Sequence, residues 1–385
     1  MKPTAAQGTF PFNEFVLKVH GHCNLACDYC YIYRSGDESW RERPRAMSRE
    51  TVARAAHRIA EHARTYALDR VHVVMHGGEP LLAGPAGIEH VAAAMTHALP
   101  APTSLSLGVQ TNGTLLDKHF LEVFSRWNIK VGVSLDGTDA DHNVHRRDRR
   151  GDGSMRRVVD GLALLTEDRT RKLFSGLLCT VDVTHDPLDT FRGLARYRPP
   201  AVDFLLPLGN WTRPPPHRSP DSTETPYADW LLQIFDHWFD APERPIGIRL
   251  FESIMGLLFG DDIPSESVGL APCRTLVIET DGSLEQADSL KSVYPGAARL
   301  GLNIRDHPLS AALSHPAIAA CQSGHSALAT ECRSCPLVRI CGGGQLAHRY
   351  RAGHSFSNPS VYSRDLQKLI HHIRARMVDA LQEPQ

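Results

Sequence analysis

Three cysteines near the amino terminus have the spacing of ligands to one compact metal group. Cys23, Cys27 and Cys30 form the pattern CxxxCxxC directly after a strand-like run at residues 12–19. A loop of this kind can wrap around a cubane 4Fe-4S cluster, and three thiolates would fill three of its corners. The fourth iron would be open for chemistry, whereas sites that only carry electrons fill all four corners. The spacing therefore predicts a reactive iron–sulfur site.

Two other kinds of site fit this spacing less well. A structural zinc site takes four protein ligands, usually as CxxC pairs. A thioredoxin-like redox pair would use Cys27 and Cys30 and would leave Cys23 without a role.

The composition excludes several classes of protein. Lys plus Arg number 42 and Asp plus Glu number 43 among 385 residues, so no overall positive field calls for nucleic acid. We find no run of about eighteen apolar residues that predicts a membrane span, and no basic and apolar regions typical of a signal peptide. We therefore expect a cytoplasmic protein, in which nine cysteines indicate metal or redox sites rather than disulfides.

Short apolar runs alternate with helical patterns along the first half of the chain. Strands are predicted at residues 15–19, 71–75, 105–109, 130–135, 177–181 and 202–206, and helices follow Ser48 and lie at 115–127, 155–165, 226–239 and 248–259. This alternation favours a parallel sheet, either open or closed into a partial barrel. Residues 210–225 are rich in proline, which predicts an extended surface segment or a flexible lid.

Polar sequences with glycine follow three successive strands. They are His76-Gly77-Gly78-Glu79-Pro80, Gln110-Thr111-Asn112-Gly113 and Ser134-Leu135-Asp136-Gly137. Ligands of parallel α/β folds bind at the carboxyl ends of the strands. Each sequence alone could be a plain turn, but all three beside a cysteine loop indicate one site.

The cysteine spacing, with Tyr29 before the last cysteine, resembles the signature of the radical S-adenosylmethionine (SAM) superfamily over residues 12–210. The resemblance implies an α/β fold with a partial (β/α)6 TIM-type barrel, a SAM-binding 4Fe-4S cluster and SAM itself. It favours a division into a barrel at residues 1–225, a helical bridge at 226–265, and a small cysteine-rich domain with a carboxyl-terminal helix at 266–385.

The same resemblance implies the SAM-binding residues. Tyr29 would lie against the adenine, and Gly77, Gly78 and Glu79 of a GGEP-like motif would take the amino group. Ser134 would contact the ribose or carboxylate. Arg146 would pair with the carboxylate, a task that suits a planar guanidinium.

A second cysteine group resembles the SPASM domain, which carries auxiliary 4Fe-4S clusters in radical SAM enzymes that modify peptides. It contains Cys332, Cys335 and Cys341, and Cys273 resembles the start of the domain. The sequences around Gly342 and after residue 357 are most similar to FxsB-like maturases, several of which form cyclophane crosslinks.

This region departs from the family pattern, because Ala287, Gln345 and Ser363 stand at three cysteine positions. The remaining cysteines allow one auxiliary 4Fe-4S cluster, with Cys321 or Cys273 as its fourth ligand. The alternative is a zinc knuckle at the same residues. Cys179 lies alone in an apolar run and is predicted to be a buried core thiol.

Asp288 follows Ala287, at the place where sulfatase-maturing relatives have a catalytic aspartate. The resemblance implies that Asp288 is a general base, and the alternative is a loop aspartate that caps local backbone.

The expected function is hydrogen abstraction from a residue of a ribosomally made precursor peptide, followed by an intramolecular, cyclophane-type crosslink. The alternatives are formylglycine formation, thioether crosslinking, and, outside catalysis, an iron–sulfur electron carrier. Expected partners are the precursor peptide and an external low-potential electron donor. The segment before the first strand is expected to be too short for a peptide-binding domain, so the leader would be recognised by the barrel, by the second domain or by a separate leader-peptide-binding protein. No nucleic acid and no membrane is expected.

Overall fold

The computed structural model describes residues 10–137, 139–219 and 222–382, which form two compact units. Unit 1 comprises the chain up to Leu135, Asp139–Gly176 and Cys273–Gln322. Unit 2 comprises Leu177–Pro272, the chain from Ser323 onward and a short segment that begins at Asp136. Each unit is thus built from several segments, whereas the predicted domains, divided after residues 225 and 265, are continuous; that division stays a prediction.

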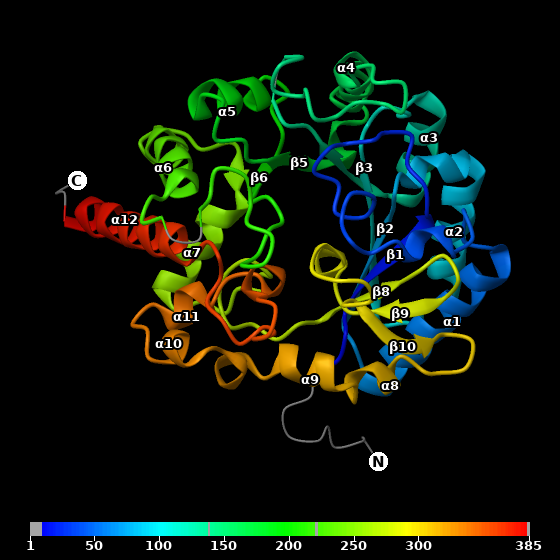
Figure 1. Ribbon diagram of the computed structural model, residues 1–385. Coiled ribbons are helices and arrows are strands. Elements are labelled where there is room, and N and C mark those ends of the chain that lie inside the picture. Colours follow the sequence, from blue (N-terminus) through cyan, green and yellow to red (C-terminus); the bar gives the residue numbers. More distant parts are fainter. Residues whose placement is uncertain (1–9, 138, 220–221, 383–385) are drawn as a thin grey trace. The chain divides into compact units, whose positions relative to one another are not determined.

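Unit 1 contains a sheet whose central strands are parallel and follow the chain order (Figure 1). The strand order is β10-β9-β8-β1-β2-β3-β4. The strands are β1 (Glu14–His20), β2 (Arg70–Gly77), β3 (Ser104–Thr111), β4 (Lys130–Ser134), β8 (Thr275–Ile278), β9 (Ser283–Glu285) and β10 (Arg299–Asn303). The predicted α/β class is confirmed, and because β1 to β4 are parallel, their carboxyl ends meet at one edge.

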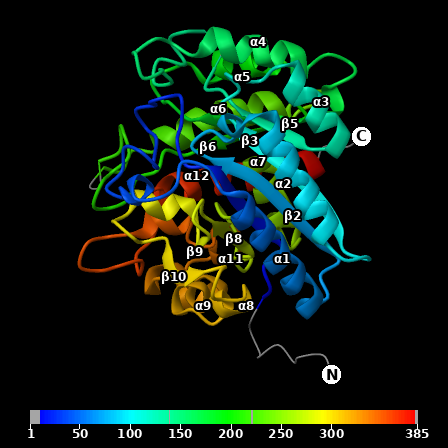
Figure 2. The ribbon, with the colours of Figure 1, turned by 90° about the vertical axis from the view of Figure 1, so that its right-hand side faces the viewer.

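The helices of unit 1 connect these strands. They are α1 (Arg49–Tyr66), α2 (Gly84–Ala98), α3 (Lys118–Trp127), α4 (Met155–Leu165), α8 (Ser310–Leu313) and α9 (Pro316–Gln322), with 3-10 turns η1 (Ser39–Arg41), η2 (Pro80–Ala83), η3 (Arg171–Leu173) and η4 (Asp288–Ser292). As predicted, Ser48 caps α1 and accepts a hydrogen bond from the Thr51 amide. Helices α1 and α2 run side by side, as Figures 1 and 2 show. Helix α3 begins three residues later than predicted, because Asp117 is its N-cap.

Strand β8 was not predicted, and it pairs in parallel with β1. Thr275 lies opposite Glu14, and Ile278 lies opposite Leu17. This pairing is the reason that residues 273–322 belong to unit 1 rather than to a separate carboxyl-terminal body. Pairing between strands so distant in sequence leaves no local pattern from which it could be predicted.

Unit 2 contains three parallel strands, β5 (Phe174–Thr180, with Leu177 onward in this unit), β6 (Ala201–Leu205) and β7 (Gly247–Ile248). Its helices are α5 (Pro187–Ala195), α6 (Pro226–Phe239), α7 (Arg249–Phe259), α10 (Thr330–Arg333), α11 (Val338–Cys341) and α12 (Ser363–Gln382), with 3-10 turns η5 (Gly324–Ala327) and η6 (Leu346–Arg349). Helix α12 packs against α6 and α7 (Figure 1). Cys179 on β5 is fully buried, as predicted.

As predicted, most of the described residues of the proline-rich segment lie at the surface, but a few contacts also anchor the segment. Asn210 and Arg218 are buried, and the Arg218 Nε donates to the carbonyl of Val361 at 3.1 Å and lies 3.6 Å from Asp365. Trp211 donates from its indole nitrogen to the carbonyl of Pro359. These contacts fix the segment to the residues before α12. None of the helices in the described parts of the chain combines the length and the hydropathy needed to cross a lipid bilayer.

Candidate active site

The cysteine loop follows β1 and is hydrogen-bonded to a second loop that precedes α4. Leu25 forms a β-bridge with Asp148, and the Ala26 amide donates to the carbonyl of Arg147 at 2.7 Å. The Asp28 amide donates to the carbonyl of His145 at 3.1 Å. The loop at residues 23–30 and the loop at residues 145–148 therefore lie side by side in unit 1 and are joined by backbone hydrogen bonds.

The sulfur of Cys23 lies in a polar, partly buried setting. The Leu25 amide donates to it at 3.4 Å and Asn112 Nδ2 at 3.6 Å. Burial above all, with smaller contributions from Glu79, Cys27 and Cys30, raises the pKa of the Cys23 thiol to about 12, against the opposing effect of the hydrogen bond from the Leu25 amide. A bound cation reverses such a shift by stabilising the thiolates. Three thiols on one loop whose thiolate forms would repel one another, with amide donors at one sulfur, fit ligation of a cationic iron–sulfur core.

Tyr29 and Arg146, both predicted to bind SAM, are brought together. Arg146 Nη1 donates to the Tyr29 hydroxyl at 2.9 Å, and only 5 % of Arg146 is exposed. The carbonyl of Arg146 accepts from the hydroxyl of Ser154, which fixes the loop at the start of α4. The guanidinium is therefore buried beside the cysteine loop rather than solvated, which argues against Arg146 as a plain member of a surface charge run.

The GGEP-like turn at the end of β2 lies against the backbone that enters the cysteine loop. Gly77 has a φ of +154°, and a Cβ there would lie 2.1 Å from the carbonyl oxygen of His20. A Cβ on Gly78 would lie 1.9 Å from the Tyr33 hydroxyl. Only glycine permits this approach, so the two glycines bring the turn against the loop.

Glu79 is completely buried and ties the ends of β2 and β3 together. Its carboxylate accepts from Thr111 Oγ1 at 2.6 Å, from the Asn112 amide at 2.7 Å and from the Leu81 amide at 3.0 Å. Burial raises the pKa of Glu79, and these hydrogen bonds oppose that effect. Glu79 therefore has a structural role, which the sequence did not indicate, in addition to the SAM contact that was predicted for it: it links the ends of β2 and β3.

Ser134 lies at the end of β4, and its hydroxyl accepts from Gln110 Nε2 at 3.1 Å. Gln110 begins the polar sequence at the end of β3. The predicted convergence of polar groups from neighbouring strand ends is therefore present for β2, β3 and β4.

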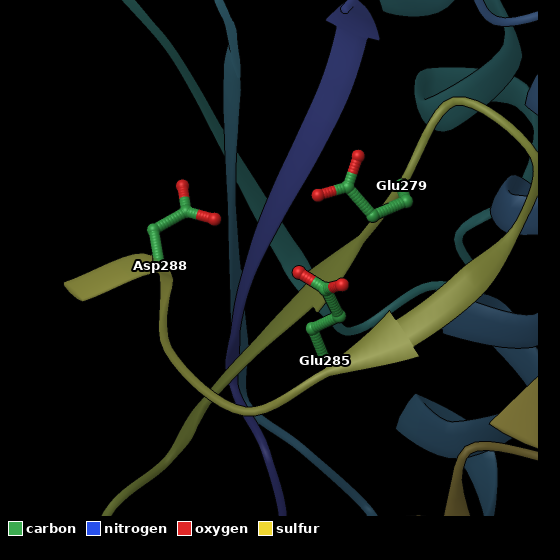
Figure 3. A group of neighbouring side chains, drawn as sticks. All are labelled: Glu279, Glu285 and Asp288. Atoms are coloured by element: carbon green, nitrogen blue, oxygen red, sulfur yellow. The ribbon is translucent and has the colours of Figure 1, made fainter. Parts of the chain in front are cut away.

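Asp288 begins η4 and belongs to a buried group of charged side chains in unit 1. We call this group the charge cluster; its members are Lys18, Arg43, His76, Glu279, Glu285, Asp288 and Lys291. Figure 3 shows the three carboxylates pointing toward a common space. The buried members are three carboxylates, three cationic side chains and His76, and Arg43 also lies 3.8 Å from the partly exposed Asp281.

The three carboxylates of the charge cluster could hold a metal ion, since one oxygen of each lies within 4.8 Å of the others. However, the ammonium of Lys291 contacts Glu279 and lies 3.0 Å from Glu285 and 3.4 Å from Asp288. Burial alone would lower the pKa of Lys291, but the carboxylates raise it, so the ammonium stays charged. The ammonium of Lys291 therefore occupies the position between these carboxylates that a metal ion would take.

The sequence analysis missed every member of the charge cluster except His76 and Asp288. One signal was available for Lys18, because a lysine stands in the apolar run of β1 and on the face opposite to Phe15 and Leu17. A lysine in a buried strand needs a partner of opposite charge. The partner, Asp288, is remote in sequence and could not be identified from the pattern.

Cys332, Cys335 and Cys341 lie in unit 2, on and between α10 and α11. Burial above all, with smaller contributions from Cys332 and Cys335, raises the pKa of Cys341 to about 11. Arg349 donates to the carbonyls of the glycines that follow: Nε to Gly343 and Gly344 at 3.1 Å, and Nη2 to Gly342 at 2.8 Å.

The two candidates for a fourth ligand, Cys273 and Cys321, belong to unit 1. Gln322, next to Cys321, donates from Nε2 to the carbonyl of Cys273 at 2.8 Å. The hydrogen bond of Gln322 therefore places the backbone of Cys273 near the end of α9, which contains Cys321.

Comparison with known proteins gives consistent results. The model of the Radical SAM superfamily matches residues 17–192. The serine-type anaerobic sulfatase-maturating enzyme of Klebsiella aerogenes is 26 % identical over 366 residues, which cover 92 % of this chain and 84 % of that enzyme. The cysteine-type enzyme of Clostridium novyi (strain NT) is 26 % identical over 274 residues, 69 % of this chain and 71 % of that enzyme.

Solved structures resemble the fold over most of the chain. The structure of anSMEcpe with bound AdoMet and Cp18Cys peptide has a TM-score of 0.80 and 22 % identity, and covers 95 % of this chain and 98 % of that chain. Streptococcus suis SuiB bound to precursor peptide SuiA has a TM-score of 0.59 and 16 % identity, covering 88 % of this chain and 72 % of that chain. The chain thus has the radical SAM α/β fold with a parallel sheet. Residues 17–192 match the radical SAM family, and this match implies an enzyme whose cofactors are a 4Fe-4S cluster and SAM.

Proposed function

We propose that this enzyme abstracts hydrogen from a residue of a ribosomally made precursor peptide and closes an intramolecular, cyclophane-type crosslink. The observation that carries the proposal is the arrangement in unit 1, where the cysteine loop, the Gly77–Gly78 turn and the buried Arg146 adjoin one another. The similarity to SuiB, solved with a precursor peptide, supports a peptide substrate.

The residues of unit 1 have distinct tasks in this proposal. Cys23, Cys27 and Cys30 hold the cluster, and Tyr29 lies against the adenine. Arg146, oriented by Tyr29, pairs with the SAM carboxylate. When bound, the reduced cluster supplies the electron that splits SAM into methionine and the radical that takes a hydrogen atom from the substrate.

The strand ends hold the rest of SAM. The backbone of Gly77 and Gly78, with Glu79, takes its amino group, and Ser134 contacts its ribose or carboxylate. Since Gln110 donates to Ser134 and three groups donate to Glu79, these side chains are oriented before the ligand arrives.

An auxiliary 4Fe-4S cluster held by Cys332, Cys335, Cys341 and either Cys321 or Cys273 would take up the surplus electron. Iron and zinc analysis of the Cys332→Ala variant tests this assignment. We expect it to lose about half of the iron of the wild type, as removal of one of two clusters requires. Full iron content, or zinc in its place, would favour the zinc knuckle.

A second candidate function is formylglycine formation, which the similarity to the sulfatase-maturating enzymes favours. Oxidation of a serine to formylglycine and formation of a carbon–carbon crosslink both remove two hydrogens, so mass alone cannot separate them. A hydrazide reagent labels the aldehyde of formylglycine and leaves a crosslinked peptide unlabelled.

The test is coexpression with a small candidate precursor peptide that contains aromatic residues, followed by mass spectrometry. We expect a loss of two hydrogens, no hydrazide label, and no fragment ions between the joined residues. A peptide with both a cysteine and an aromatic residue also tests thioether crosslinking, because a cysteine in a thioether can no longer be alkylated. Unchanged peptide together with 5'-deoxyadenosine release would contradict the crosslinking proposal for that peptide class. In vitro, an external low-potential donor must replace the cellular one, and a separate leader-binding protein must be added if turnover requires it.

A further inference from the structure

A cavity of about 430 Å³ adjoins the cysteine loop in unit 1. Its lining residues are His20, His22, Cys23, Asn24, Arg45, Leu82 and Arg149. Among these described residues, Cys23 is shared with the predicted cluster ligands, and none is a predicted SAM contact. Cavities of about 300–1,000 Å³ are the size that proteins use for small ligands. The cavity is therefore large enough to take a side chain of a bound peptide.

Two guanidinium groups line this cavity without a partner of opposite charge. Arg45 and Arg149 are both exposed, and neither side chain forms a hydrogen bond or an ion pair with the residues that the structure describes. Burial first, and then the charges of Arg45, His20 and Arg149, lower the pKa of the His22 imidazole. The positive charges of both arginines therefore act on one small region of the cavity.

Asp148, the acidic neighbour of Arg149, is engaged elsewhere. Its carboxylate accepts from the backbone amides of Arg150 and Asp152 at 2.9 Å and 3.1 Å. It also lies 3.1 Å from the guanidinium of Arg157. Of the described residues that line the cavity, none is acidic. An anion that enters the cavity therefore meets no competing carboxylate in this lining.

The backbone holds both arginines beside the cysteine loop. The carbonyl of Arg45 accepts a hydrogen bond of 2.7 Å from the amide of Gly21, which precedes the first cysteine. Arg149 directly follows Asp148, which forms a β-bridge with Leu25. Both side chains thus start from segments that are paired with the cysteine loop or with the residues that enter it. Their backbone positions are therefore set before a ligand binds, which lowers the entropy cost of binding.

Two arginines without partners favour a carboxylate as the ligand. A guanidinium binds a carboxylate through two parallel hydrogen bonds, and two positive charges in one cavity repel each other until an anion is bound. Leu82, which is 37 % exposed, lines the same cavity and offers an apolar contact for the methylene groups beside a carboxylate. In an unmodified peptide, the side chains of Asp and Glu and the carboxyl terminus are the anions at neutral pH.

We propose that Arg45 and Arg149 form an anion subsite that binds a carboxylate of the precursor peptide, and that the substrates of this enzyme are therefore acidic peptides. This inference rests on the proposed function only in taking a peptide as the ligand, since it holds for crosslinking and for formylglycine formation alike. The cavity has the size of a side chain, whereas protein partners dock on surfaces of roughly 800 Å² on each side. A peptide carboxylate is therefore favoured over an acidic protein partner.

The experiment measures the binding of three pools of short peptides to immobilised holoenzyme. Every peptide is acetylated, contains a tyrosine and has random positions that are free of acidic residues. The first pool carries an internal glutamate and an amidated carboxyl terminus, and the second carries glutamine in its place. The third pool has the glutamine and a free carboxyl terminus. Mass spectrometry gives the retained fraction of each pool.

The wild type should retain the first pool, the third pool or both about tenfold better than the second, as expected for hydrogen bonds to a charged group. Preference for the first pool identifies an acidic side chain as the ligand, and preference for the third identifies the carboxyl terminus. Arg45→Met and Arg149→Met should bring this ratio close to one. Arg45→Lys should keep part of it, because the charge remains without the planar fork.

The matched control is Arg156→Met, which removes the same charge from α4. Arg156 is exposed, forms no hydrogen bond or ion pair with the described residues, and is not among those that line the cavity. This variant should keep the ratio of the wild type. SAM affinity, measured by calorimetry, should be the same in the wild type and in all of these variants.

Three results would overturn the inference. The first is equal retention of the three pools by the wild type, or a preference that persists in both Arg45→Met and Arg149→Met. The second is a loss of SAM affinity of about tenfold in these two variants, which would assign the arginines to the cofactor. The third is an unchanged peptide ratio together with slower reduction of Arg45→Met by an acidic flavodoxin but not by dithionite, which would assign them to an electron donor.

The outcomes also separate this inference from the function on which it rests, because retention of the pools requires no turnover. A preference for a carboxylate pool together with a hydrazide-reactive product keeps the anion subsite and contradicts the crosslinking function. A crosslinked product together with a ratio close to one overturns the anion subsite alone.

Discussion

The Arg146 guanidinium and the Tyr29 hydroxyl are joined by a hydrogen bond of 2.9 Å. Because Tyr29 belongs to the cysteine loop, this bond couples the orientation of Arg146 to that loop. We predict that Tyr29→Phe weakens SAM binding by about tenfold, the effect expected for losing one hydrogen bond to a charged group. Calorimetric titration of reconstituted protein with SAM measures it.

The matched control for this prediction is Arg147→Lys, because Arg147 is the exposed neighbour of Arg146. Its side chain donates to the nearby carbonyl of Val144. SAM affinity should be unchanged in this variant. Equal affinities for Tyr29→Phe and wild type would show that Tyr29 does not orient Arg146 for the cofactor.

Cys23 is proposed as a cluster ligand, whereas Cys179 is a buried core thiol, so their alanine variants should behave differently. Cys23→Ala should lose the site-specific iron and all 5'-deoxyadenosine release, since two thiolates hold a cubane cluster poorly. Cys179→Ala should keep both and lose roughly 1 kcal/mol of unfolding free energy, because Cys179 is fully buried on β5. Iron assay, visible absorbance and denaturant unfolding check the pair. Full 5'-deoxyadenosine release by Cys23→Ala would refute the assignment of the cluster.

Glu79 should be needed for stability as well as for SAM. Glu79→Gln replaces one accepting oxygen by an NH2 group that faces the donors of β3. We expect the free energy of unfolding to fall by about 2–3 kcal/mol, the cost of leaving buried donors unsatisfied. Urea unfolding of the protein without cofactors measures this effect separately from SAM binding. An unchanged midpoint would mean that Glu79 serves the ligand alone.

The lowered pKa of His76 predicts how the stability of the protein changes with pH. Its pKa in the folded protein is lowered to about 4 by burial and by Lys18, whereas an unfolded histidine titrates near 6.5. Between these values the unfolded chain binds the extra proton, so stability falls as pH decreases from about 6.5 to about 4. The full effect is at most about 3 kcal/mol. His76→Gln should lose this part of the slope, while the exposed His57→Gln on α1 should keep it. Urea midpoints as a function of pH decide between them, and parallel slopes for His76→Gln and wild type would contradict the lowered pKa.

The elements that depend on residues close together in the sequence could be predicted from it. The six strands, the N-cap at Ser48 and the position of the cysteine loop follow from periodicity and spacing, and the structure confirms them. Helix α2 was missed because Gly84 and Pro85 stand at its start and mask the helical pattern. The charge cluster was missed for a different reason, since it depends on pairing between residues that are remote in sequence. Asp288 was found only through resemblance, and its partner Lys18 only through the structure.

The pairing of β8 with β1 has a consequence for biosynthesis. While the chain leaves the ribosome, β1 gains β2 early, but its other edge stays uncovered until residues 275–278 have been made. An uncovered edge of an apolar strand invites pairing with another nascent chain. A fragment that stops at residue 225 or 265 would keep that edge permanently open and would lack Asp288 beside Lys18, so the three-cysteine segment cannot be isolated as a minimal catalyst.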